Sequence, residues 1–375
     1  MRFVDEFRDP EIIAKTAEEV RHLVDPARHY RFMEVCGGHT HAIYRFGLKD
    51  LLPSNIELIH GPGCPVCVLP MGRIDDGLSI CTHENVVFTA FGDMMRVPGT
   101  HGSPLEYKAR GADVRIVYSP SDALKLARLN PDKHILFFAI GFETTAPSTA
   151  LTLIRARAEG LKNFSVFCNH VTIIPGIRAI LDSPDMRLDA FIGPGHVSTV
   201  IGCRPYEWIA RNERKPIVVS GFEPLDMLQS TVMILRQLRA GEARVENQYR
   251  RVVPWEGNRA ALRAMAEVFQ LRPYFEWRGL GFISQSALRI RDEYAQWDAE
   301  RRFQVPGVRV TDPRAAQCGE VLKGVLKPAQ CKLFGRECTP EHPIGALMVS
   351  TEGSCAAYHN YEHRKQLLTN IQTAA

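Results

Sequence analysis

The stretch His134-Ile-Leu-Phe-Phe-Ala-Ile140 decides the fold class, because it is short, almost entirely apolar and followed at once by a glycine. Residues 85–91 (Asn-Val-Val-Phe-Thr-Ala-Phe) and 216–220 (Pro-Ile-Val-Val-Ser) have the same character. Continuous runs of β-branched and aromatic residues are typical of parallel strands that are buried on both faces. Such runs alternate with helical patterns, the first expected at residues 11–24 behind Asp9 and a proline, so the sequence predicts an α/β fold.

A similar loop follows each of these strands. Residues 86–98 align without a gap on residues 135–147, sharing an alanine, a glycine and a proline, and residues 218–224 repeat the ending. We interpret them as related strand–loop units that bring three carboxylates to one rim of a sheet, where α/β proteins bind ligands: Asp93, Glu143 and Glu223. The alternative is that these acids cap the helices that follow. No loop matches a phosphate-binding motif, so we predict no nucleotide site.

The chain divides into three predicted domains. Residues 1–117 form an α/β domain that carries Cys36 and a C-x-x-C pair, and residues 118–225 form a second, similar parallel-sheet α/β domain. From about residue 226 helical runs predominate, followed by a loop-rich tail. We therefore expect residues 226–375 to be a mainly helical, loop-rich domain, and its cysteines make it a candidate iron-sulfur domain.

Composition excludes several classes of protein. The chain has 375 residues, of which 45% are apolar, enough to bury a large core. Its net charge is only +4 and its charges are interspersed, so we expect neither a nucleic acid nor a membrane surface as a partner. The charged start of the chain does not resemble a signal peptide, and no apolar run is long enough for a membrane helix. We therefore expect a cytoplasmic location.

Four of the ten cysteines lie among short loops near the carboxyl end: Cys318, Cys331, Cys338 and Cys355. In a reducing compartment such a set favours metal binding over structural disulfides. The intervals match neither the close pairs of a zinc ribbon nor the tight ferredoxin run. We favour a [4Fe-4S] cluster, whose corners are well separated, over zinc, with four unligated cysteines as the alternative. Three single cysteines in apolar runs are interpreted as packing residues: Cys81, Cys168 and Cys203.

A C-x-x-C pair, Cys64 and Cys67, lies in residues 61–67 (Gly-Pro-Gly-Cys-Pro-Val-Cys), directly after the apolar run 56–60. In a cytosolic α/β protein this spacing indicates a redox couple. A helix beginning near Met71 would lower the pKa of a nearby thiol. The alternative is that the two cysteines are ligands of a metal ion, and this role is compatible with a redox role.

Cys36 is the third cysteine element. It follows an apolar strand and precedes Gly37 and Gly38, where the backbone can approach a ligand closely. His39 and His41 lie within reach as ligands or proton donors. Thiolates are soft donors that suit iron, and a dithiol with an iron-sulfur cluster forms a two-electron reductant that is recharged one electron at a time.

Taken together, these motifs resemble the HypD family of [NiFe]-hydrogenase maturation proteins, and the resemblance covers essentially the whole chain. It rests on residues 36–47 (Cys-Gly-Gly-His-Thr-His-Ala-Ile-Tyr-Arg-Phe-Gly), 61–67, 91–99 (Phe-Gly-Asp-Met-Met-Arg-Val-Pro-Gly), 141–147 (Gly-Phe-Glu-Thr-Thr-Ala-Pro), 169–171 (Asn-His-Val), 193–197 (Gly-Pro-Gly-His-Val) and the four tail cysteines. The resemblance implies a role in building the Fe(CN)2CO group of the hydrogenase active site.

The resemblance also implies partners and site residues. A HypC-type scaffold protein would share iron with Cys36, and the family's iron site includes the positions of Cys64 and Cys67. A HypE-type carrier would deliver the cyano group as a thiocyanate. The dithiol would supply two electrons to release cyanide, and the [4Fe-4S] cluster on the tail cysteines would replenish them. A protein that works through such complexes is expected to be a monomer alone.

Roles beyond the cysteines are inferred from residue chemistry. His39 or His41 would donate the proton that accompanies cyanide transfer, and Glu143, Asp93 and His196 would orient the iron ligands. One competing function is a general ferredoxin-linked thiol-disulfide oxidoreductase, which would not need Cys36. Another is a zinc-bound interaction module.

Overall fold

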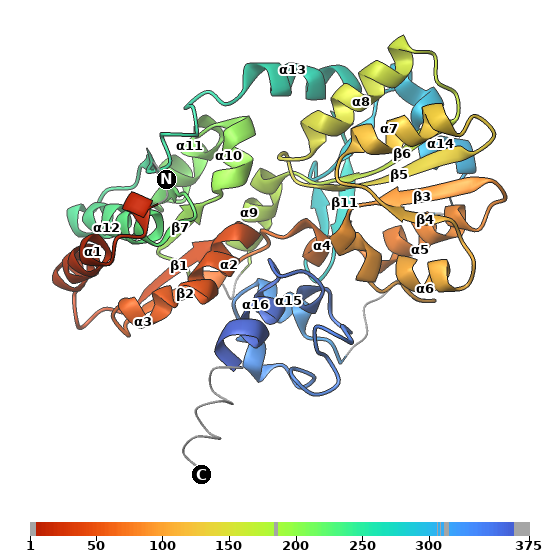
Figure 1. Cartoon of the computed structure of the whole chain (residues 1–375). Coiled ribbons are helices and arrows are strands. Elements are labelled where there is room, and N and C mark those ends of the chain that lie inside the picture. Colours follow the sequence, from red (N-terminus) through yellow and green to blue (C-terminus); the bar gives the residue numbers. More distant parts are fainter. Residues whose placement is uncertain (1–4, 184–186, 306, 308, 311–314, 364–375) are drawn as a thin grey trace.

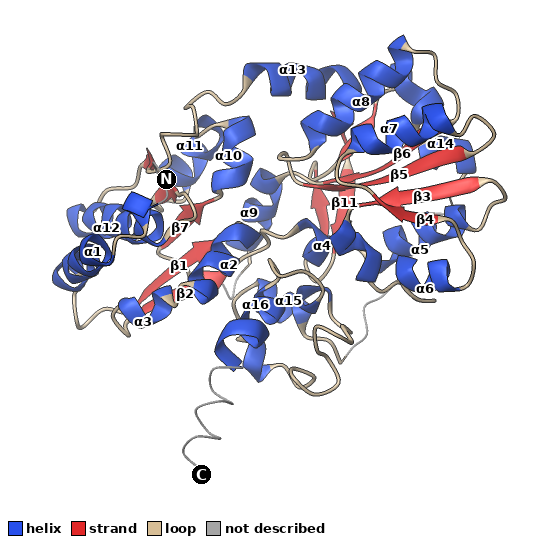
Figure 2. Cartoon of the chain, in the orientation of Figure 1, coloured by secondary structure: helices blue, strands red, loops and turns tan. Residues whose placement is uncertain are grey.

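Two parallel sheets form the framework of the computed structural model, which describes residues 5–183, 187–305, 307, 309–310 and 315–363 (Figures 1 and 2). The first, sheet A, has the strand order β2 (Ile56–His60), β1 (Tyr30–Glu34), β7 (Ala190–Gly193), β8 (Ile217–Val219) and β9 (Val245–Asn247). The second, sheet B, has the order β4 (Val114–Ile116), β3 (Val86–Ala90), β5 (His134–Gly141) and β6 (Phe164–His170). Every pair of neighbouring strands in both sheets is parallel, so the predicted α/β class is confirmed.

Sheet B is inserted into the chain between two strands of sheet A. Helices α4 (Pro65–Val68) and α5 (Met71–Cys81) lead from β2 to β3, and α9 (Ile173–Leu181) leads from β6 back to β7. The sheets therefore divide the chain differently from the predicted boundaries. Residue 117 falls inside sheet B, directly after β4, and β9 joins sheet A although it lies beyond residue 225.

The aligned strand–loop units are neighbours rather than parts of separate domains. Residues 86–98 and 135–147 begin with β3 and β5, which pair in sheet B with Val86 opposite His134. The third unit, residues 218–224, belongs to sheet A. The repeat therefore reflects adjacent parallel strands whose loops leave the same edge of one sheet.

Helices cover both sheets. Around sheet A lie α1 (Pro10–Leu23), α2 (Gly37–Arg45), α3 (Leu48–Leu51), α10 (Gly195–Ile201), α11 (Glu207–Asn212) and α12 (Pro224–Ala240), and around sheet B lie α6 (Pro104–Ala109), α7 (Pro120–Leu129) and α8 (Ala146–Ala158). Helix α1 begins as predicted, because the Asp9 carboxylate accepts hydrogen bonds from the N–H groups of Glu11 and Ile12, with Pro10 at the first position.

The region after β9 combines helices, short antiparallel strand pairs and loops. Helix α13 (Arg259–Val268) runs across the top of the two sheet units in Figure 1. It is followed by the pairs β10 (Phe269–Leu271) with β13 (Leu288–Ile290) and β11 (Tyr274–Trp277) with β12 (Gly281–Ser284), then by α14 (Ala299–Phe303). The tail, residues 315–363, contains α15 (Cys318–Leu322) and α16 (Ser354–Tyr358) and lies beneath the junction of the two sheet units (Figure 1).

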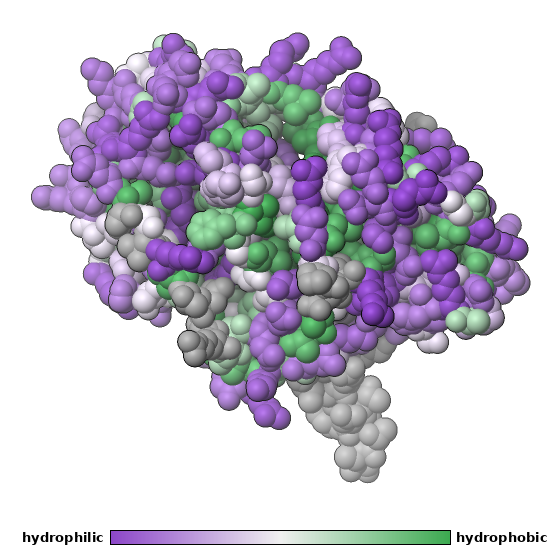
Figure 3. All heavy atoms as spheres, turned by 180° about the vertical axis from the view of Figure 1, so that it is seen from behind, coloured by the Kyte–Doolittle hydropathy of each residue, from purple (hydrophilic) through white to green (hydrophobic). Residues whose placement is uncertain are grey.

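Short helical turns complete the described chain. They are the 3-10 turns Asp5–Phe7, Gly92–Arg96, Arg204–Tyr206, Asp292–Trp297, Pro328–Gln330 and Ala346–Met348 and the π turn His359–His363. No helix in the described part of the chain combines the length and apolarity that crossing a membrane requires. The outer surface is mostly hydrophilic over both sheet units, and apolar surface gathers between them in the rear view (Figure 3).

Each sheet contains a switch point, where the strand order reverses. In sheet A the switch point lies between the neighbouring strands β1 and β7. From β1 the chain continues to β2 on one side, and from β7 it continues to β8 on the other side. In sheet B the corresponding neighbours are β3 and β5. Ligands of open α/β sheets bind beyond the carboxyl ends of the strands at such points, because the loops there diverge and leave a crevice.

The loops that follow β1 and β2 lie in direct contact. The carbonyl oxygen of Gly63 accepts a hydrogen bond of 3.1 Å from the N–H of Gly37. A Cβ atom on Gly63 would lie 2.5 Å from the Cα of Cys36 and from the carbonyl carbon of Val35. Glycine at position 63 is therefore required for the loop with the C-x-x-C pair to reach Cys36.

We predict that Gly63→Ala lowers the free energy of unfolding by about 1–3 kcal/mol, because the new methyl group overlaps backbone that cannot move away. Gly92→Ala is the matched control, since its nearest neighbour, Ile116 Cγ2, would lie 4.0 Å from the new methyl group. Denaturant unfolding measures both variants. Equal stability of the two would show that the loops separate without cost.

Candidate functional site

The Cys36 thiol lies at the carboxyl end of β1, where it precedes helix α2. The residue has an extended backbone and occupies the N-cap position, and its side chain is only 4% exposed. Its N–H donates a 3.0 Å hydrogen bond to Glu34 Oε2. Its sulfur lies 3.7 Å from Nδ1 of His196, which follows β7. The switch point of sheet A therefore brings a thiol and an imidazole together.

A cavity of about 620 Å³ opens beside this pair. Its walls come from the carboxyl ends of strands in both sheets and from the tail, and they include Cys36, His196 to Val197, Phe91 to Met94, Ile140 to Phe142, Thr144 to Thr145 and Glu352. The first two groups follow β1 and β7, and the next three follow β3 and β5. The switch points of both sheets thus face one common cavity.

Burial controls the protonation of Cys36. Removal from water, followed by the nearby carboxyls of Glu352 and Glu34, raises the pKa of the Cys36 thiol to about 12. The backbone N–H groups of Gly38 and His196 act in the opposite direction, because they favour the thiolate. The thiol is therefore protonated at neutral pH, and a cation that binds it must displace this proton.

Cys64 and Cys67 are joined by a disulfide bond, so the pair is present in its oxidised form. Cys64 precedes α4, and both residues are buried. Neither lines the cavity, although Gly63, Pro65 and Val66 do. Of the three predicted iron ligands, the structure thus exposes Cys36 to the cavity and holds the other two in the adjoining loop. An iron-binding role for Cys64 and Cys67 remains a prediction.

The two predicted catalytic histidines do not line the cavity. His39 is fully buried, and its Nε2 donates to the carbonyl oxygen of Ser220 at 3.1 Å. Burial lowers the pKa of His39, so its imidazole is neutral. The ring of His41 meets Tyr361 edge-on, with 5.5 Å between the ring centres. The histidine beside the thiol is His196, whose side chain is exposed and lines the cavity.

The three acids predicted at one rim have different environments. Asp93 lines the cavity and accepts a 3.0 Å hydrogen bond from the hydroxyl of Ser350. Glu143 is buried and accepts the N–H of Ile173 at the start of α9. Glu223 pairs with Arg8. Asp93 therefore matches the ligand interpretation. Glu223 occupies the N-cap position of α12, as the capping alternative expects, whereas Glu143 contacts the start of α9 and not α8, the helix that follows it.

Glu352 is the cavity residue to which the sequence assigned no role. Its side chain packs against Gly37, where an added Cβ would lie 2.8 Å from Glu352 Oε2. Burial, then the charges of Asp93 and Glu34, raises the pKa of Glu352. The available signal was its position three residues before Cys355, because any fold that gathers the tail cysteines also fixes Glu352 nearby.

The four tail cysteines line one small, largely apolar cavity of about 20 Å³. Burial, then the thiols of the other three, raises the pKa of Cys355 well above its usual value. Gly345 closes one side: its N–H lies 3.4 Å from Cys338 Sγ, and a Cβ there would meet Cys318 Sγ at 2.5 Å. These residues could hold a cofactor with soft sulfur ligands. No group of three or more His, Cys, Asp or Glu side chains in the described chain is arranged to hold a single metal ion.

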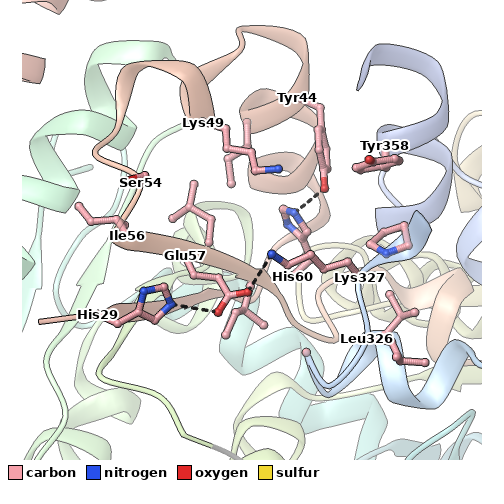
Figure 4. A pocket seen from close by; sticks show the side chains of 16 residues that line it. His29, Tyr44, Lys49, Ser54, Ile56, Glu57, His60, Leu326, Lys327 and Tyr358 are labelled. Atoms are coloured by element: carbon pink, nitrogen blue, oxygen red, sulfur yellow. Dashed lines mark hydrogen bonds and ion pairs between the residues drawn. The ribbon is translucent and has the colours of Figure 1, made fainter. Parts of the chain in front are cut away.

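A series of hydrogen bonds runs from Glu34 to Tyr44, whose ring contacts the tail; Figure 4 shows the bond between His60 and Tyr44. Glu34, fully buried, accepts from Thr40 and lies 2.8 Å from His60 Nδ1, while His60 Nε2 lies 2.9 Å from the hydroxyl of Tyr44. The ring of Tyr44 meets Tyr358 of α16 edge-on. These side chains border a cavity of about 260 Å³ whose opposite wall includes the tail residues Leu326 and Lys327.

The fold and these sites define a class: an α/β protein whose two parallel sheets share a thiol-bearing cavity, next to a disulfide loop and a separate group of four thiols. Comparison with known proteins then identifies the family. The family model described as "HypD: Hydrogenase formation hypA family" matches residues 11–362. This chain belongs to the HypD family of hydrogenase maturation factors.

Relatives from several bacteria are similar over nearly their whole length. The hydrogenase maturation factor HypD of Escherichia coli (strain K12) is 55% identical over 370 residues, covering 97% of this chain and 99% of the relative. The HypD of Rhizobium leguminosarum bv. viciae is 54% identical over 378 residues, covering 99% of this chain and 98% of the relative. The HypD of Rhodobacter capsulatus is 55% identical, covering 96% of this chain and 98% of the relative. The family resemblance found in the sequence is confirmed.

The buried carboxyl of Glu143 predicts a pH-dependent stability. Burial raises its pKa from 4.5 to about 7, so between these values the folded chain binds more protons than the unfolded chain. This carboxyl therefore lowers stability as the pH rises through that window. We expect Glu143→Gln, whose amide oxygen still accepts the Ile173 N–H, to be more stable than the parent above pH 7 by up to about 3 kcal/mol.

The difference should vanish below about pH 4.5, where the Glu143 carboxyl is protonated in both states. Denaturant unfolding at several pH values measures it, with Glu213→Gln as the control because Glu213 is exposed. Parallel pH profiles for the parent and Glu143→Gln would contradict the assigned cause.

Proposed function

We propose that this chain binds iron at Cys36 and assembles the Fe(CN)2CO group there, in complex with a HypC-type scaffold and a HypE-type thiocyanate carrier. The observation that carries the proposal is the approach of Cys36 Sγ to His196 Nδ1 at 3.7 Å, on the wall of the cavity where both switch points meet. A thiolate and a neutral imidazole both suit iron. A scaffold cysteine would add a further ligand from the partner.

The surrounding charges favour a cation in this cavity. Two carboxyls, Glu352 and Asp93, line its wall, and an arriving iron ion would relieve the repulsion that raises the pKa of Glu352. Burial and His39 lower the pKa of His196, so its imidazole is neutral at neutral pH and offers one ring nitrogen as a metal ligand. Iron binding releases the thiol proton of Cys36, and binding is therefore expected to strengthen as the pH rises.

Cyanide release requires a two-electron reductant. The carrier thiocyanate takes up two electrons and one proton and yields the carrier thiol and cyanide, which binds the iron. The Cys64/Cys67 dithiol gives those two electrons and forms the disulfide that the structure contains. The contact between Gly63 and Cys36 supports this coupling, because it holds the dithiol loop against the iron ligand.

We also propose that Cys318, Cys331, Cys338 and Cys355 hold a [4Fe-4S] cluster. Their common cavity, the soft donor set and the mutual electrostatic influence of the thiols fit such a group, and Gly345 leaves room where a side chain would collide with Cys318. When bound, the cluster supplies single electrons that return the disulfide to the dithiol. The N–H of Gly345, which faces Cys338 Sγ, would stabilise the bound thiolate.

A general thiol-disulfide oxidoreductase is the competing function. It would use the disulfide and the tail thiols but would give no role to Cys36, His196 or the cavity between the sheets. Infrared spectroscopy separates the two proposals. After anaerobic isolation of the chain with its scaffold partner, bands of iron-bound cyanide and carbon monoxide support cofactor assembly, and a complex without them supports the oxidoreductase.

We predict that Cys36→Ala abolishes iron retention in the scaffold complex while the absorption of the tail cluster persists. The matched control is Cys203→Ala, because Cys203 is an equally buried thiol whose pKa burial also raises to about 12. Metal analysis and infrared spectra of both complexes give the measurement. Iron at the parent level in Cys36→Ala would exclude a ligand role for this thiol.

The tail cluster gives a separate prediction. Cys338→Ala should remove the visible absorption of the cluster and about four irons per chain, because one corner of the cluster loses its thiolate. Cys168→Ala serves as the control, since that thiol is buried in sheet B away from the tail. Zinc in place of iron in the anaerobically isolated parent would contradict the cluster and favour a structural metal site.

A further inference from the structure

The ring of Phe222 stacks on two histidine rings. Phe222 belongs to the loop that joins β8 to α12. It stacks on His196, with ring centres 3.9 Å apart and planes inclined by 24°. It also stacks on His39, with ring centres 4.7 Å apart and planes inclined by 30°. The edge of Tyr249 closes a third side at 5.9 Å and 90°. Phe222 thus links His39 of α2 to His196, the histidine beside the Cys36 thiol.

Two glycines make this close stack possible. A Cβ on Gly38 would lie 2.7 Å from Phe222 Cε1 and 3.0 Å from His196 Cε1. A Cβ on Gly195 would lie 3.0 Å from Phe222 Cε2 and Cζ. Both glycines lie in the first turns of helices that follow strands of sheet A, Gly38 in α2 after β1 and Gly195 in α10 after β7. Their missing side chains form the slot into which the phenyl ring fits.

The Phe222 loop is itself held in place from several directions. His39 Nε2 donates to the carbonyl oxygen of Ser220, and the N–H of Gly221 donates to Gln248 Oε1 at 3.2 Å. The N–H of Glu223 donates to Asp226 Oδ2 at 3.1 Å, and Asp226 in turn pairs with Arg251. A ring mounted on such a fixed loop is a rigid platform for whatever stacks on it.

His196 needs such a platform, because its side chain is exposed to the cavity. Its imidazole stacks on Phe222 and brings Nδ1 close to Cys36 Sγ. Without the stack, the ring could rotate about its two side-chain bonds and turn Nδ1 away from the thiol. Aromatic stacking restricts that rotation while leaving the nitrogen free to bind.

We propose that Phe222 is a positioning residue that fixes the His196 imidazole against the Cys36 thiol, and that His39 acts through Phe222 rather than on the substrate. This inference rests on the proposed iron site. It assigns a role to the buried histidine of the Cys-Gly-Gly-His-Thr-His segment that differs from proton donation, and it explains why that histidine lies outside the cavity.

The test uses cobalt(II) as a spectroscopic probe on the anaerobically purified full chain. Titration gives an affinity, and the difference spectrum against Cys36→Ala isolates the thiolate–cobalt absorption of this site. Phe222→Leu should weaken cobalt binding by about 10- to 100-fold, as for other residues that orient metal ligands, and should change the band shape. His39→Gln should act in the same direction, because it removes the second ring that stacks on Phe222.

Phe32→Leu is the matched control. Phe32 is fully buried in β1 of the same sheet, so the same substitution lowers stability there without touching His196. Its cobalt affinity and spectrum should equal those of the parent. A second readout needs no metal: the ring protons of His196 shift in the NMR spectrum when they lie over a phenyl ring, and Phe222→Leu should remove that shift.

The outcomes separate this inference from the proposed function. Parent-like cobalt binding and spectrum in Phe222→Leu, with both lost in Cys36→Ala, would overturn the positioning role and leave the iron site intact. An unchanged cobalt spectrum in Cys36→Ala would overturn the iron site itself. If Phe222→Leu does not fold, His39→Gln decides the question, and parent-like affinity in that variant would contradict the proposal.

Discussion

Parallel strands deliver their carboxyl ends to one edge of a sheet, and in this chain two such edges face each other across one cavity. Cys36 and His196 end the two strands at the switch point of sheet A, and Phe91 and Ile140 lie at the ends of the corresponding strands of sheet B. Everything at the site depends on this arrangement, because residues far apart in sequence become neighbours only when both crevices open toward each other. The loops then need glycine, since side chains would fill the space between them.

The sequence predicted the elements of the fold better than their connection. Apolar runs such as residues 134–140 indicated the strands, because burial on both faces leaves a strong pattern. The boundary at residue 117 did not match the sheets, because the strand order of a parallel sheet depends on where each crossover helix packs. The return of the chain through α9 to sheet A leaves no local mark in the sequence.

The same distinction applies to the candidate site. The four tail cysteines, grouped by their spacing, line one cavity, and the cluster assigned to them remains a prediction. The pairing of Cys36 with His196, rather than with a histidine three residues away, was not predictable from proximity along the chain. His39 lies in the first turn of α2, where its direction is fixed by the helix and leads into the packed region beneath the loop. Long-range neighbours, not adjacent residues, complete the environment of the thiol.

The tail packs against the part of sheet A that carries Cys36, so the cavity is complete only when the tail is in place. Glu352 lines the cavity from the same segment that carries Cys355, Ser350 of that segment donates a hydrogen bond to Asp93, and Tyr358 of α16 packs on Tyr44 of the Cys36 helix. A nascent chain whose carboxyl-terminal segment has not yet docked therefore presents an unfinished cavity with one acidic wall missing. The complete cavity therefore forms only once the carboxyl-terminal segment has been synthesised and has docked against the Cys36 helix.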